Sequence, residues 1–200
     1  MRAALRSELR WPLTGLAILL AGVVLWCFGA PLDRGLFDLL LLDQQPRCAA
    51  LMRGLTILGG FAVLGPLLLL IVVALFAARR NKPAIWLLVT VMSGRIMIDL
   101  LKMITDRPRP PLGDRLTDVS SMSFPSAHAG NSLLTLLALL VVFPAARRWL
   151  LPFGAGLIVA IGWSRIGLGV HWPSDILAGW GFALLWASVA VRWLPASSRA

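Results

Sequence analysis

Residues 164–175 read Ser-Arg-Ile-Gly-Leu-Gly-Val-His-Trp-Pro-Ser-Asp and lie between two apolar runs. Pro173 has a fixed φ and needs no hydrogen bond at its nitrogen, so it suits the first turn of a helix. His171 then lies just before a helix start, and Asp175 lies one turn further on. A carboxylate beside one ring nitrogen fixes the tautomer and leaves the other nitrogen as a nucleophile, while Arg165 offers a planar fork for phosphate oxygens. The alternative is an interfacial histidine with an aspartate that only caps a helix.

The composition excludes an ordinary soluble domain. Of 200 residues, 58% are hydrophobic and 14% are charged, which predicts an all-α polytopic membrane protein. The net charge of +10 could suggest nucleic acid, but the basic residues stand in short clusters between apolar runs, so we expect membrane lipids and no nucleic acid as partners. Cys27 and Cys48 lack metal-ligand spacing and are expected to be packing thiols; whether they pair stays open.

Six apolar runs predict one domain, residues 1–200, with six transmembrane helices. The expected spans are about 12–30, 55–78, 84–104, 126–143, 150–169 and 173–194. The first run is too long for a signal peptide and is expected to stay as a span. Residues 31–54 are expected to form a polar loop whose apolar piece, 36–42, lies along the surface.

Clusters of basic residues predict the orientation. They occur at the N-terminus, at 79–82, at 147–148 and in the C-terminal tail that includes Arg199. With six spans these segments share one side, which the positive-inside rule makes cytoplasmic. Both termini are then cytoplasmic, and the loops 31–54, 105–125 and 170–172 face outward. We expect a multi-pass protein of the cell (inner) membrane.

Two more stretches place polar groups at the same outer face. Lys102 closes the third span, and Arg109 follows in a loop that prolines stiffen. Residues 125–128, Pro-Ser-Ala-His, open the fourth span, where free N–H groups and the helix dipole attract phosphate. Ser126 can cap the helix or donate to an oxyanion, and His128 is placed to donate a proton. Each stretch alone has a structural alternative: a snorkelling lysine, a helix cap and an interfacial histidine.

Together the three stretches hold three cations, two histidines and one carboxylate, which is the inventory for in-line displacement at phosphorus. They resemble the three signature motifs of the type-2 phosphatidic acid phosphatase superfamily, which also includes soluble acid phosphatases and vanadium haloperoxidases. The matching patterns are Lys102-x6-Arg109-Pro110, Pro125-Ser126-Ala127-His128 and Ser164-Arg165-x5-His171-x3-Asp175. The six-span layout extends the resemblance over most of the chain.

The resemblance implies a role for each matching residue. His171 would attack phosphorus and become a phosphohistidine, Asp175 would orient it, and His128 would protonate the leaving oxygen and then activate water. The phosphate oxygens would be held by Lys102, Arg109, Ser126, the Ala127 N–H and Arg165. No metal or other cofactor is implied. The family more often has glycine where this chain has Ala127, and we expect Ala127 to adopt ordinary first-turn helical geometry.

One hypothesis comes from spacing alone. Arg95, Asp99, Lys102 and Asp106 recur at spacings of four, three and four, so they share one face of the third span. Charges at that depth are costly unless paired, so we expect Asp99 to pair with Arg95 and to steer Lys102. The alternative is a purely structural pair. The roles of Arg107 and Arg115 stay open.

These features predict a metal-independent phosphatase that acts on a lipid phosphate or diphosphate at the outer leaflet. A prenyl diphosphate carrier and a glycerophospholipid phosphate, such as phosphatidic acid or phosphatidylglycerophosphate, both fit. A phosphotransferase and a lipid A phosphatase could use the same site. A transporter or a non-catalytic scaffold belongs to another class, and a transporter predicts broken spans with polar residues repeated in two halves, which this sequence lacks. The oligomeric state is not predicted.

Overall fold

In a computed structural model, residues 2–42, 46–111, 113 and 115–193 are described, and they contain helices and loops without any strand. The predicted all-α class is therefore confirmed. The helices are α1 (Arg2–Phe28), α2 (Ala30–Leu40), α3 (Pro46–Gly59), α4 (Phe61–Ala77), α5 (Asn81–Thr105), α6 (Ala127–Val142), α7 (Arg147–Gly167) and α8 (Pro173–Ala190). Short 3₁₀ turns follow at Pro144–Ala146 and Val191–Trp193.

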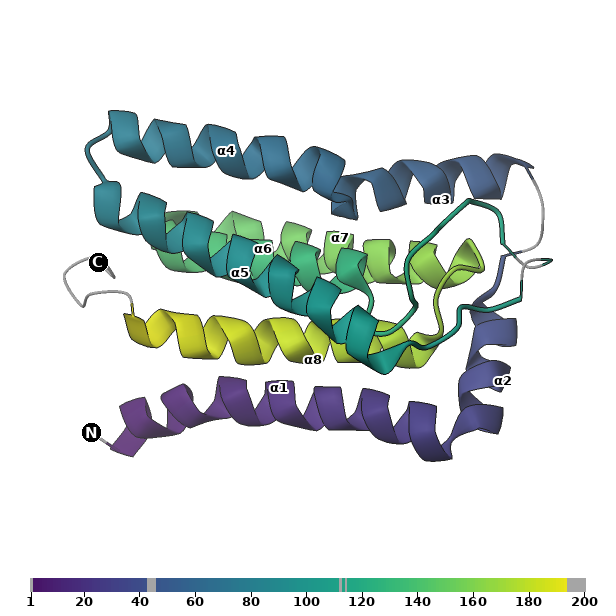
Figure 1. Ribbon diagram of the computed structural model, residues 1–200. Coiled ribbons are helices and arrows are strands. Elements are labelled where there is room, and N and C mark those ends of the chain that lie inside the picture. Colours follow the sequence, from purple (N-terminus) through teal and green to yellow (C-terminus); the bar gives the residue numbers. More distant parts are fainter. Residues whose placement is uncertain (1, 43–45, 112, 114, 194–200) are drawn as a thin grey trace.

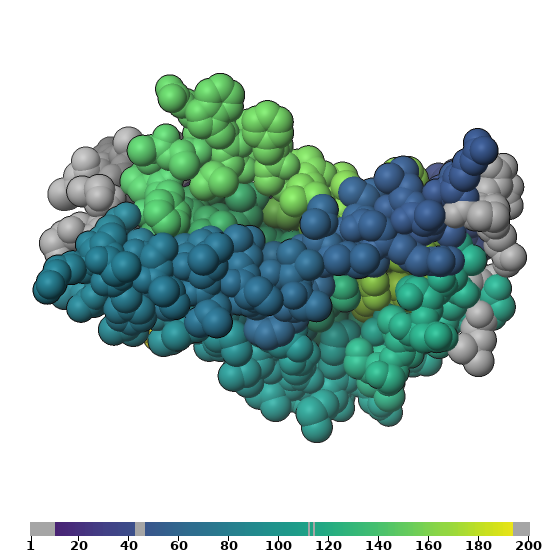
Figure 2. Space-filling model, turned by 90° about the horizontal axis from the view of Figure 1, so that it is seen from above, coloured from purple at the N-terminus to yellow at the C-terminus, as the bar shows by residue number. Residues whose placement is uncertain are grey.

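The long helices run side by side, and α2 lies across one end of them (Figure 1). Helices α3 and α4 follow each other as one broken rod, which crosses one face of the molecule in Figure 2 between α7 and α5. The start of α1 and the end of α8 lie at the end remote from α2. The loop 106–126 and the link 168–172 lie at the same end of the molecule as α2 (Figure 1). The sequence predicts the active site in these segments.

Several helices have the length and composition of membrane spans. Within the described residues five stretches are long and apolar enough: Trp11–Phe28, Arg47–Ala77, Asn81–Thr105, Pro144–Gly167 and Pro173–Trp193. Helix α6 is apolar but has only 16 residues. The chain is thus built as a multi-pass membrane protein, while the sixth crossing stays a prediction. The predicted polar tail with Arg199 lies outside the described residues.

The prediction for residues 31–54 was wrong in two respects. Residues 46–54 are not a loop, because α3 begins at Pro46. The helical segment that was expected to start at residue 55 therefore starts at Pro46. Arg47 and Arg53 suggested a loop, but both are exposed on the helix. Residues 31–40 are not a loop either, because they belong to α2. The position of the apolar piece 36–42 along the surface stays a prediction; within it Phe37 is buried, whereas Asp38 and Leu39 are exposed. Cys27 and Cys48, whose pairing was left open, are both free thiols; Cys27 is exposed, so it is not the packing thiol that was expected, and Cys48 is half-buried.

Glycines bring α8 close to its neighbours. A Cβ on Gly179 would lie 2.7 Å from the carbonyl oxygen of Ser126, and one on Gly181 would clash with the backbone nitrogen of Leu19. Because glycine has no Cβ, the helix backbones can approach closely at these positions, which stabilises helix pairs in lipid. The close approach at Gly179 sets the start of α6 against α8. His128 lies in the first turn of α6, Asp175 lies in the first turn of α8, and His171 lies in the link just before α8.

Candidate active site

The link before α8 holds the His171 ring in one orientation. Pro173 occupies the first position of α8, as predicted, and Trp172 is the N-cap residue. Asp175 Oδ2 accepts a hydrogen bond from the Trp172 backbone N–H at 2.9 Å and lies 3.0 Å from His171 Nδ1. Because an ionised carboxylate can only accept, Nδ1 carries the proton and Nε2 keeps its lone pair.

Arg109 approaches the other side of that ring. Its Nη1 lies 3.2 Å from His171 Nε2 and donates to the Val170 carbonyl at 2.6 Å, while its Nε donates to the Ser121 carbonyl at 2.7 Å. Burial lowers the pKa of His171 well below its ordinary 6.5, and the nearby cation of Arg109 lowers it further. The ring is therefore neutral at pH 7, which is the state of a nitrogen nucleophile.

Lys102 reaches the same region from the last turn of α5. Its ammonium is buried and donates to the carbonyls of Met122 at 2.6 Å and Ser123 at 3.2 Å. Asp106 ends the helix in the left-handed conformation, with φ of 43°, which aspartate tolerates better than most residues. The Lys102 ammonium thus anchors the loop 106–126 through two of its carbonyls.

Arg165 and Ser126 contribute unpaired polar atoms. Arg165 Nη1 donates to the hydroxyl of Thr56 on α3 at 2.6 Å, but its Nε has no partner among the described residues. The Ser126 hydroxyl is also buried there without a partner. Buried polar groups are nearly always hydrogen-bonded, so donors left free at the start of α6 and the end of α7 fit an oxyanion site.

His128 lies in the first turn of α6 and is partly exposed. A Cβ on Gly60, at the break between α3 and α4, would lie 3.4 Å from His128 Nε2. Ala127 is the first residue of α6, so the expected helical geometry at this position is confirmed. The Ser126 backbone N–H donates to the carbonyl of Asp175 at 3.0 Å, which ties the start of α6 to α8.

The predicted pair of Arg95 and Asp99 lies earlier in α5 than Lys102. Arg95 and Asp99 approach to 3.7 Å, and the Arg95 guanidinium stacks over the Phe61 ring, 4.1 Å from its centroid. The pairing is therefore present. In the described part of the chain Lys102 is held by backbone carbonyls and not by Asp99, so the steering of Lys102 stays a prediction.

The sequence reasoning missed several residues that contact this cluster. Thr56 stands in an apolar run just before Gly59 and Gly60, and a lone hydroxyl beside a glycine pair was the available signal. Ser123 donates to Asp175 Oδ2 and had no distinguishing pattern. Asp33 and Arg107 form ion pairs that reach Asp175, although the role of Arg107 was open and Asp33 was read as part of a polar loop.

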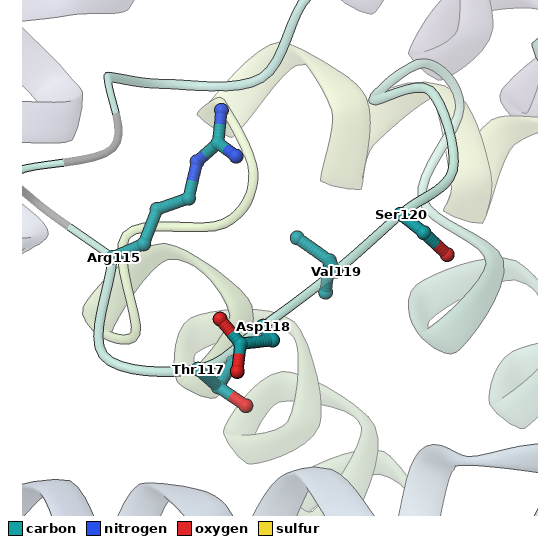
Figure 3. Close-up of a pocket in the computed structure, with 5 residues that line it drawn as sticks. All are labelled: Arg115, Thr117, Asp118, Val119 and Ser120. Carbon is teal, nitrogen blue, oxygen red and sulfur yellow. The ribbon is translucent and has the colours of Figure 1, made fainter.

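A separate hollow of about 370 Å³ lies in the loop 106–126 (Figure 3). It is lined by Arg115, Thr117, Asp118, Val119 and Ser120. Arg115 Nε donates to the carbonyl of Pro110 at 2.8 Å, so this arginine shapes the loop. The predicted phosphate-binding residues belong to the cluster around His171 and not to the lining of this hollow.

Comparison with known proteins identifies the family. Residues 83–199 match the model of the PAP2 superfamily. The chain belongs to the PAP2 superfamily. This assignment confirms the family expected from the three motifs, and with it the expectation of a membrane phosphatase.

Related proteins extend the PAP2 assignment beyond the matched segment. Phosphatidylglycerophosphatase B of Bacillus subtilis (strain 168) is 31% identical over 160 residues, which cover 76% of this chain and 78% of that protein. Decaprenylphosphoryl-5-phosphoribose phosphatase of Mycobacterium tuberculosis (strain ATCC 25618 / H37Rv) is 33% identical over 143 residues, covering 69% and 76%. The crystal structure of a transmembrane PAP2-type phosphatidylglycerolphosphate phosphatase from Bacillus subtilis superposes with a TM-score of 0.80 at 26% identity, covering 91% of this chain and 94% of that one.

Proposed function

We propose that this PAP2 protein hydrolyses a lipid phosphate or diphosphate through a phosphohistidine formed on His171. The proposal rests on the two contacts that orient the His171 imidazole. Asp175 Oδ2 lies 3.0 Å from Nδ1, and Arg109 Nη1 lies 3.2 Å from Nε2. A carboxylate behind the ring and a cation in front of it suit attack by Nε2 on an anionic phosphorus centre.

In the first step Nε2 forms a bond to phosphorus, and the bond from phosphorus to the leaving oxygen breaks. His128 gives its proton to that oxygen, and Asp175 stabilises the imidazole while it is cationic. In the second step His128, now neutral, takes a proton from water, whose oxygen attacks phosphorus and breaks the bond to Nε2. Inorganic phosphate leaves and His171 is neutral again.

The phosphate oxygens are held by Lys102, Arg109, Arg165, Ser126 and the Ala127 N–H. Three side-chain cations supply the charge stabilisation that a metal would otherwise give. We therefore expect full activity in EDTA. Vanadate, which resembles the five-coordinate phosphorus of each step, should inhibit competitively. Loss of activity in EDTA that returns with a divalent cation would contradict this part of the proposal.

The proposed substrate is a lipid phosphate at the outer leaflet of the cell membrane. Two relatives have names that point to a glycerophospholipid phosphate and to a prenyl-linked phosphate. The proposed topology has six crossings and both termini in the cytoplasm, because the basic clusters then share one side. The long apolar tail would lie between helices and add affinity, at roughly 25 cal/mol per Å² of surface removed from water.

The test is phosphate release in detergent from a panel of phosphatidylglycerophosphate, phosphatidic acid, a prenyl diphosphate and a soluble aryl phosphate. We expect the wild type to release phosphate fastest from one of the lipids and His171→Ala to release none above background. Equal turnover of all four would contradict a lipid substrate. Retained turnover in His171→Ala would contradict the phosphohistidine.

A further inference from the structure

Asp175 uses its second oxygen for a residue that the proposed mechanism does not employ. Arg107 Nη1 donates to Asp175 Oδ1 at 2.7 Å, whereas Oδ2 serves His171. The other arm, Nη2, donates to Asp33 Oδ2 at 2.7 Å. Asp175 is 0% exposed, Asp33 2% and Arg107 7%, so these charges compensate one another out of water.

Asp33 brings a separate helix into this network. It lies on α2, and its Oδ1 accepts a hydrogen bond from the Ser174 backbone N–H at 3.0 Å. The Ser174 hydroxyl accepts from Arg107 Nη1 at 2.6 Å and donates to Asp33 Oδ2. Phe37, one turn after Asp33, is fully buried and fixes the same face of α2. The first turn of α8 is thus tied to α2 through Asp33 and to the loop 106–126 through Arg107.

The two arms of Arg107 distinguish this network from a simple helix tether. A tether for α2 needs only the pair between Arg107 and Asp33. Here the same guanidinium also holds the carboxylate that orients the His171 ring, and the fork geometry of arginine fixes both carboxylates at once. The ring of Trp26, 5.2 Å from the guanidinium carbon, covers the network. Displacement of Arg107 would therefore move Asp175.

We propose that Arg107 and Asp33 are positioning residues for His171, acting through Asp175. This inference rests on the proposed function. The network orients the His171 ring, because it fixes the position of Asp175 Oδ2. It also sets the net charge that acts on the ring. Without Arg107 the negative charge of Asp175 acts more strongly on the ring and favours its protonation. Without Asp33 the cation of Arg107 is unopposed and disfavours it. The groups facing the ring that stay constant in this comparison are Asp175, Arg109, Arg165, Lys102 and His128.

The test compares Asp33→Asn and Arg107→Gln with Asp38→Asn. Asp38 is a matched control, because it lies on the same helix as Asp33 but is 54% exposed and, among the described residues, pairs with Arg34 alone, at 3.2 Å. We expect kcat to fall about a hundredfold in both network variants, since small misplacements of a catalytic group have that cost, while KM changes less than about twofold. Asp38→Asn should match the wild type.

The pH dependence of kcat/KM gives a readout that simple structural damage does not produce. We expect its acid limb to move to lower pH in Asp33→Asn and to higher pH in Arg107→Gln. Wild-type kcat in both variants, or acid limbs that stay or move the same way, would overturn the proposal. If Arg107→Gln does not fold in detergent, Arg107→Lys keeps the charge without the fork. It should then lose kcat with an unmoved acid limb, and wild-type kcat there would overturn the proposal.

The two proposals fail in different ways. Retained phosphate release in His171→Ala would remove the proposed function. An inactive His171→Ala together with fully active Asp33→Asn and Arg107→Gln would remove only the positioning role.

Discussion

The two histidines of this chain differ in the hydrogen-bond partners that hold their rings. His171 is buried in the link before α8, with Asp175 at Nδ1 and Arg109 at Nε2. His128 stands in the first turn of α6, is partly exposed, and has no carboxylate hydrogen-bonded to its ring within the described residues. The difference is one of constraint: a buried carboxylate fixes the tautomer of His171, whereas the described residues supply no such partner for His128.

This difference assigns the two chemical roles. A nucleophile needs a fixed lone pair and support for the cation that it becomes, which a buried carboxylate provides. A group that first gives and then takes a proton must change its state within one turnover, and a fixed partner would hinder that change. Removal of either ring, or of the Asp175 carboxylate that holds the ring of His171, should therefore change the rate of phosphate release by different amounts and in different ways.

The largest effect is expected for His171→Ala. Removal of a nucleophile costs on the order of 10⁶-fold in kcat, because no other group can form the covalent intermediate. Phosphate release measured with the best lipid substrate should fall to background, with an unchanged melting temperature in detergent. A loss smaller than about a hundredfold would mean that the two histidines do not differ as described.

Asp175→Asn is expected to reduce kcat by about 10⁴-fold, because an amide can donate to Nδ1 and so favours the wrong tautomer. The change keeps the shape of the side chain, so KM for the lipid should stay within about threefold, as expected for a group that does not bind substrate. Steady-state kinetics would decide. A rise in KM at constant kcat would assign Asp175 to binding instead.

His128→Ala should slow turnover by about 10²- to 10⁴-fold, the usual contribution of a general acid. The loss should shrink for aryl phosphates whose leaving group is already acidic, since these need no proton, until release of phosphate from His171 limits the rate. Rates across a series of aryl phosphates would show this. An equal loss for every leaving group would contradict the acid role.

The pH profile should report the neutral His171. Burial and the nearby cations lower its pKa below 6.5, so the deprotonated, active form persists as the pH falls through 6.5. The acid limb of kcat/KM should therefore lie below pH 6.5, and activity at pH 6 should stay within about twofold of the value at pH 7. A limb above pH 6.5 would show that the ring gains a proton more easily than its surroundings predict.

The smallest effect is expected for Asp99→Asn. The pair with Arg95 is long, at 3.7 Å, and Asp99 is 50% exposed, while Lys102 has its own carbonyl partners. We expect kcat to change by about twofold, because a Coulomb contribution of this kind is weak. A tenfold fall in kcat with an unchanged melting temperature would instead support the steering of Lys102.

The site was predictable where its signals are local. Pro173 marks the start of α8 and Ser126 marks the start of α6, so the positions of His171 and His128 follow from a few neighbouring residues. Asp33 gave no such signal, because its partner Ser174 is 141 positions away and only the crosswise packing of α2 joins them. The extent of α3 was missed because exposed arginines on a helix and arginines in a loop look alike in a sequence.

The most direct measurement is to trap the phosphohistidine intermediate on His171, the proposed nucleophile. His128→Ala, which should form the phosphoenzyme and break it down slowly, is mixed with a radiolabelled aryl phosphate that has an acidic leaving group. We predict an acid-labile, base-stable label on His171, located by mass spectrometry, and no label in the His171→Ala/His128→Ala double variant. Label on another residue, or rapid turnover without any label, would contradict this prediction.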